Sequence, residues 1–150
     1  RAWATVVSSA SAMTVQVSST SAGKCGLSIV QITGAAGIPS NFASDDNANA
    51  DPTVTLGSAP AASSTVLGFI AAAGSSAISP PSGYTELDEQ IINTDLIIEV
   101  AYDAVSAATS AGWSTGNTRG VGILVEVQEA AGAVRVLPPR SRRFQHMIIR

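Results

Sequence analysis

Residues 80–103, PPSGYTELDEQIINTDLIIEVAYD, constrain the fold of this chain most, because they read as turn, strand, turn and strand. Two prolines and a glycine at the start exclude a helix and a central strand there. After Asp95, apolar and polar side chains alternate, as they do in a strand with one buried face. The alternation predicts an inward face with Leu96, Ile98, Val100 and Tyr102 and an outward face with Asp95, Glu99 and Asp103.

A second clear alternation lies in residues 119–128, and it predicts another strand. The inward set there is Val121, Ile123, Val125 and Val127, and the outward set is Gly120, Gly122, Leu124, Glu126 and Gln128. The two strands together predict the core of the protein.

The rest of the chain is also predicted to be all-β. Ala, Ser, Thr, Gly and Val dominate, whereas the residues that favour helices are scarce. Further strands are expected at residues 3–7, 13–17, 25–33, 53–57, 65–73 and 133–137, with 25–33 central and 34–52 a long loop. Short strands with frequent turns predict a two-sheet antiparallel β-sandwich, and a jelly-roll order is one arrangement open to it.

Charge divides the chain into a body, residues 1–137, and a C-terminal arm, residues 138–150. The first 139 residues carry four basic and all eleven acidic residues, while the last eleven carry the other four basic residues. Pro138 and Pro139 end the last expected strand of the body. Cys25 is the only cysteine, so an intrachain disulfide is excluded.

No metal site is expected, but oxygen-bearing side chains at alternate positions match part of the pattern of a calcium loop. They are Asp45, Asn47, Asn49 and Asp51. Ala50 stands where a calcium-binding EF-hand loop needs glycine, and Leu56 stands where it needs a bidentate glutamate, so an EF-hand is excluded. A solvated loop explains the same residues, since Asn and Asp favour turns. No cofactor is expected.

Catalytic groups are sparse in the sequence. Glu86 and Asp88, predicted to share a face, and the adjacent Glu89 could supply the paired carboxylates of a glycosidase, but a solvated strand face explains them as well. His146 is the only histidine and lies in the arm, away from any serine nucleophile of the body. The sequence therefore predicts a protein that is not an enzyme.

Binding residues are few as well. Trp113 lies in a turn-rich stretch and is either a core residue or an exposed ring that binds glycans. The acidic body argues against a dedicated nucleic-acid binder. The longest apolar run, residues 66–73, is too short to span a membrane.

From about residue 52 to residue 129 the chain resembles a β-sandwich domain common in virion proteins of tailed phages. The resemblance rests on the step Pro81-Ser82-Gly83-Tyr84-Thr85-Glu86-Leu87, followed by the segments LIIEVAYDA, GWSTGN and GVGILVEVQ. It implies a structural protein of the virion, on a capsid or a tail. Within that class, the small single domain, the low charge and the basic arm favour a capsid decoration protein that binds neighbouring subunits. The alternative is a tail or fibre component that binds host glycans.

The arm is expected to dock on capsid or tail subunits or on a second copy of the chain, as strands do when they add to a sheet edge. Its apolar side chains alternate, and its arginines would meet carboxylates. The residues expected to bind are Arg140, Arg142, Arg143, Phe144, His146 and Ile148.

Overall fold

The computed structural model describes residues 26–32, 34–37, 39–47, 51–92, 95–104, 108–116 and 119–130. This part of the chain contains seven strands and no helix. The strands are β1 (Phe42–Asn47), β2 (Thr53–Thr55), β3 (Thr65–Ala72), β4 (Thr85–Ile92), β5 (Leu96–Asp103), β6 (Ser110–Gly112) and β7 (Gly120–Val127). The prediction of an all-β chain is confirmed for these residues.

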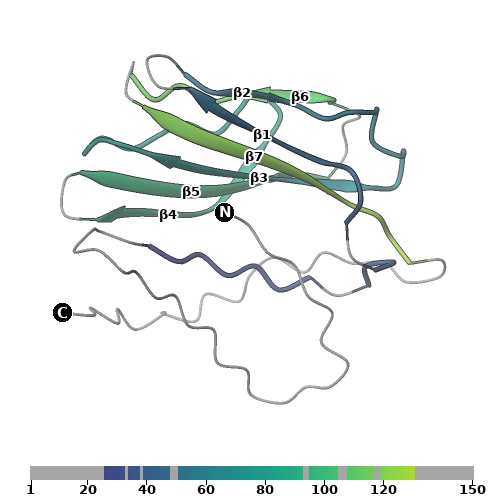
Figure 1. Cartoon of the computed structure of the whole chain (residues 1–150). Coiled ribbons are helices and arrows are strands. Elements are labelled where there is room, and N and C mark those ends of the chain that lie inside the picture. Colours follow the sequence, from purple (N-terminus) through teal and green to yellow (C-terminus); the bar gives the residue numbers. More distant parts are fainter. Residues whose placement is uncertain are drawn as a thin grey trace, which may run out of the picture.

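The strands form two antiparallel sheets, one of five strands and one of two. The large sheet has the order β1-β7-β3-β5-β4, and the small sheet pairs β2 with β6. Figure 1 shows the small sheet against one face of the large sheet, near β1 and β7. Side chains of both sheets belong to a single buried cluster, which includes Val54 of β2, Ala111 of β6 and Leu124 of β7.

The hairpin that the sequence predicts most clearly is present. β4 pairs with β5 from Thr85 opposite Tyr102 to Ile92 opposite Leu96. A β-bulge shifts the register between Glu86 and Asp88. An extra residue at a bulge moves the following side chains to the other face of a strand.

The predicted inward residues of β5 and β7 do share one face of the large sheet. Phe69 of β3, for example, lies opposite both Val100 and Ile123. That face, however, points away from the small sheet. The face toward the small sheet carries the side chains predicted to be outward, including Leu124, Glu99 and Glu126, which are all buried. The predicted orientation of both strands is therefore wrong.

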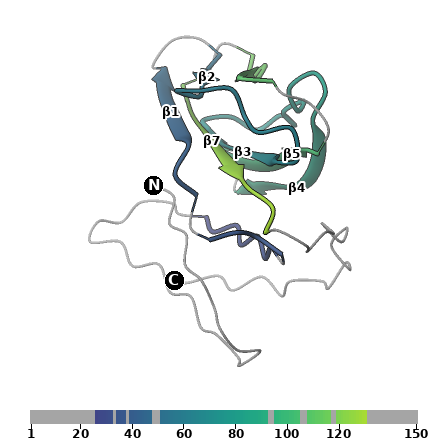
Figure 2. The same ribbon diagram turned by 90° about the vertical axis from the view of Figure 1, so that its right-hand side faces the viewer.

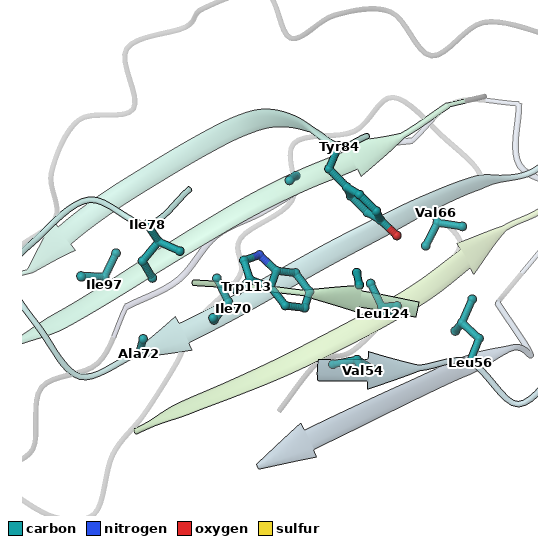
Figure 3. Close-up of a cluster of buried hydrophobic side chains, with 12 residues drawn as sticks. Val54, Leu56, Val66, Ile70, Ala72, Ile78, Tyr84, Ile97, Trp113 and Leu124 are labelled. Atoms are coloured by element: carbon teal, nitrogen blue, oxygen red, sulfur yellow. The ribbon is translucent and has the colours of Figure 1, made fainter. Parts of the chain in front are cut away.

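Trp113 explains why this orientation is stable. This residue comes directly after β6, and its side chain enters the space between the sheets, where Figure 3 shows it among Ile70, Leu124 and Tyr84. Gly68 and Gly122 of the large sheet leave room for it, because a Cβ at Gly68 would lie 2.8 Å from Cζ2 of the indole. Glycines in the middle of these strands thus form a recess for the largest side chain of the core.

The opposite face of the large sheet is also apolar and largely covered. Leu67, Val100 and Val127 are buried there, and Ile98 and Ile123 are half-buried. Residues 26–32 run along this side of the sheet, as both views show, and Gly26 lies close to Ile92 and Ile98. Because both faces of the sheet carry buried apolar side chains, alternation cannot say which face meets the second sheet.

Two expectations about the first third of the chain are wrong. The described part of the expected central strand, residues 26–32, has no strand structure, and Leu27, Ile29 and Ile32 are exposed. The expected loop at residues 34–52 contains β1, which pairs with β7 along its full length. Asp and Asn are uncommon in strands, but an edge strand tolerates them because one side of it faces solvent.

Other expected elements lie outside the described residues. They are the strands at residues 3–7, 13–17 and 133–137 and the arm at residues 138–150. Within the described ranges, no helix is long and apolar enough to cross a membrane.

The recess for Trp113 generates a test of the core. Gly68→Ala should lower the free energy of unfolding by about 1–3 kcal/mol, since the added methyl group meets the indole in a packed interior. Gly57→Ala is the matched control, because a Cβ at Gly57 has nothing within 4 Å. Urea unfolding measures both variants, and equal midpoints would show that the indole does not fill this recess.

Candidate functional site

Three carboxylates lie in the interior between the two sheets. Glu99 and Asp103 come from β5 and Glu126 from β7, and their side chains are 0%, 3% and 3% exposed. They reach the interior because their apolar neighbours in the sequence occupy the opposite face of the sheet. Buried carboxylates require hydrogen-bond donors or protons, so their surroundings decide what they do.

Glu126 is a fully engaged structural group. Its Oε1 accepts hydrogen bonds from the Ser64 hydroxyl at 2.6 Å and the Ala61 amide at 2.8 Å. Its Oε2 accepts one from Asn41 Nδ2 at 2.7 Å. These bonds, led by the one from Ser64, lower the pKa of Glu126. The carboxylate therefore ties the start of β1 and the loop before β3 to β7.

Glu99 accepts fewer hydrogen bonds than Glu126. Trp113 Nε1 donates a hydrogen bond to its Oε1 at 3.2 Å, and its Oε2 has no hydrogen-bond partner among the described residues. Glu86 and Glu89 of β4 lie on the same face of the sheet. The pKa of Glu99 is raised to about 7, chiefly by burial; the bond from Trp113 opposes the rise, and the charges of Glu86 and Glu89 contribute to it. Glu99 is thus poised to carry a proton near neutral pH.

Tyr84 and Asp103 form the other polar part of this interior. Burial raises the pKa of Tyr84 to about 12, and the charge of Asp103 adds to the rise. The phenol therefore stays protonated under ordinary conditions. It packs in the core beside β4 (Figure 3).

The interior carboxylates are too buried for a substrate to reach them, which argues against catalysis there. A general acid must come within hydrogen-bond distance of its substrate, and Glu99 is 0% exposed. A cleft lined by Asn41, Glu126 and Gln128 lies at the other end of this layer and has a volume of about 100 Å³. Small-molecule sites usually measure about 300–1,000 Å³. The cleft has room for a few waters but not for a sugar or a nucleotide.

The carboxylates of β4 do not form the pair considered for glycoside hydrolysis. The bulge at Leu87 places Glu86 opposite Ala101 and Asp88 opposite Val100, so these two side chains lie on opposite faces. The prediction that they share a face is wrong. Glu89 accepts a hydrogen bond from the Ile78 amide at 2.7 Å and so holds the chain before the hairpin.

The acidic loop considered for calcium contains carboxylates with other partners. Asp45 accepts a hydrogen bond from the Thr53 amide at 3.0 Å. Asp51 accepts two from Thr115, from the amide at 2.6 Å and the hydroxyl at 2.7 Å. No group of His, Cys, Asp or Glu side chains suited to a metal occurs in the part of the chain that the structure describes, and Asn49 lies outside it. Asn47 ends β1.

Trp113 is a core residue, because its side chain is 2% exposed. The alternative of an exposed glycan-binding ring at this position is therefore wrong. The arm residues Arg140, Arg142, Arg143, Phe144, His146 and Ile148 lie outside the described residues, so they are not placed relative to the interior carboxylates.

Sequence reasoning assigned Glu99, Asp103 and Glu126 to solvent and so missed the interior layer. One signal was present in the sequence: Ile97 and Ala101 interrupt the polar side of β5, and Leu124 interrupts that of β7. A polar face that also carries large apolar residues is typical of a strand covered on both sides.

Comparison with known proteins finds no family model, no curated protein and no solved structure that matches this chain.

Glu99 should make the protein less stable as the pH rises. Between its ordinary pKa of 4.5, expected in the unfolded chain, and about 7, the folded state binds more protons than the unfolded state. The stabilisation by protonated Glu99 is complete below pH 4.5 and is lost as the pH rises through about 7. The free energy of unfolding should fall by up to about 3 kcal/mol over this range.

Urea unfolding of wild type and Glu99→Gln from about pH 5 to 8 measures this effect. The Gln variant should lose the decline in stability. Glu126→Gln is the control, because a lowered pKa gives stability that is lost when the pH falls. Parallel pH profiles for wild type and Glu99→Gln would contradict the assignment.

Asp51 should act as a loop anchor and not as a metal ligand. Asp51→Ala removes two acceptor contacts to Thr115 and should lower the free energy of unfolding by about 1–3 kcal/mol. Millimolar calcium should leave the melting temperatures of wild type and variant unchanged. A rise for wild type that the variant lacks would identify a calcium site through binding linkage.

Proposed function

We propose that this protein is a non-enzymatic structural protein of a phage virion, built as a β-sandwich and acting as a capsid decoration protein. It would bind neighbouring virion subunits through its surface and its basic arm. The observation that carries the proposal is the structural role of the sequence step that resembles phage virion domains.

That step builds the turn into β4. The Tyr84 amide donates a hydrogen bond to the Pro81 carbonyl at 2.9 Å, and Gly83 has a φ of 88°, which favours glycine. Pro81 and Tyr84 are buried, and Tyr84 belongs to the core cluster. The motif therefore has an architectural role, as expected for a scaffold domain whose function lies in assembly.

The described polar groups support assembly over catalysis. The most perturbed carboxylates are enclosed between the sheets, and the exposed ones of β4 point to different faces. The glycan-binding alternative loses its aromatic platform, because Trp113 is part of the core. The low charged fraction of 13% suits a protein that packs against neighbours.

Deletion of residues 140–150 tests this function. The truncated chain should keep the wild-type melting temperature and lose self-association and binding to capsids of the encoding phage, because the arm carries half of the basic residues. Calorimetry measures the first property, and sedimentation velocity measures the second with and without capsids. Undiminished assembly of the truncated chain would contradict the proposal, as would a gene located away from the capsid and tail genes.

A further inference from the structure

β4 is one of the two edge strands of the large sheet. It pairs with β5 on one side, and no described strand lies on its other side. Both views show β4 as the last strand at its end of the sheet (Figures 1 and 2). The backbone N–H and C=O groups on the outer side of an edge strand are free to pair with an added strand.

The β4 edge is acidic, and its charge is not neutralised within the described residues. Glu86, Asp88 and Glu89 lie on this strand, and none of them forms an ion pair there. The opposite edge, β1, differs in this respect. On β1, Asp46 forms an ion pair with Arg119 at 3.4 Å.

Two features restrict what can bind at β4. A second acidic β4 strand would be repelled, since like charges opposite each other destabilise a strand pair. The bulge between Glu86 and Asp88 interrupts regular pairing at the start of the strand and leaves residues 88–92 in regular register with β5. The edge therefore fits a short strand that carries positive charge.

The sequence contains one segment with these properties. Residues 140–150, RSRRFQHMIIR, carry four arginines, and their apolar side chains include Phe144, Ile148 and Ile149. The rest of the chain has a net charge opposite in sign. Complementary charge brings such segments together and determines which partner binds.

We propose that the β4 edge binds residues 140–150 of a second copy of this chain as an added strand. The inference rests on the proposed assembly function and names the receptor of the arm. Each copy then offers one edge and one arm, and such head-to-tail contacts close into rings or continue as chains. Both outcomes suit a protein that covers a capsid.

A second copy can approach residues 88–92, which keep a regular register with β5, in the antiparallel direction. Antiparallel pairing is the more stable of the two directions.

A pair of charge reversals in the full-length chain tests the receptor. Asp88→Lys on β4 should raise the dissociation constant for self-association about tenfold or more, since it places like charges opposite each other. Asp46→Lys is the matched control, because it makes the same charge change on the exposed edge strand β1. It should change the dissociation constant less than about twofold. Melting temperatures establish that both variants are folded, and sedimentation equilibrium at low and high salt measures association.

A mixing experiment identifies the partner. Full-length Asp88→Lys and full-length Arg142→Glu/Arg143→Glu should each stay monomeric and should associate when mixed, because the intact arm of the first meets the intact edge of the second. Failure of the two variants to associate on mixing would overturn the second-copy arrangement. A monomeric wild type that melts at a higher temperature than Asp88→Lys would overturn it too. If Asp88→Lys associates like wild type while the arm deletion does not, the arm has another receptor, and only the assembly function stands.

Discussion

The insertion of Trp113 into a recess of the large sheet is the contact on which the rest of the interior depends. An indole fits there only because Gly68 and Gly122 carry no side chains. Once the ring is buried, its Nε1–H needs an acceptor, and Glu99 supplies one from β5. The need to pair this one donor explains a carboxylate at the centre of an otherwise apolar cluster, and it links β6 to β5 across the two sheets.

The interior carboxylates differ in how well their charges are stabilised. Glu126 accepts bonds from three donors on two segments, the start of β1 and the loop before β3, so its charge is stabilised and both segments are held to β7. Glu99 accepts one long bond and faces two other glutamates. Glu126 lies on β7, which pairs with β1, and Glu99 lies on β5, which pairs with the edge strand β4.

The features that support assembly lie on the outside of this interior. The large sheet has a second apolar face, partly covered by residues 26–32, and exposed apolar side chains such as Phe42, which is 68% exposed. Its two edges differ in charge compensation. A sheet with such surfaces can contact several neighbours, and the groups of its interior maintain the shape that presents them. This division is compatible with the proposed assembly function.

The sequence by itself determined the all-β class, the hairpin of β4 and β5, and the strand β7, since alternation and turn residues are local signals. It also determined which side chains of β5 and β7 share a face. Only the tertiary structure decided which face meets the small sheet, because both faces are apolar and the choice depends on the glycine recess for Trp113, which forms from two strands distant in sequence. β1 was missed for a related reason: its acidic residues have no strand signal, and pairing with β7 makes it a strand.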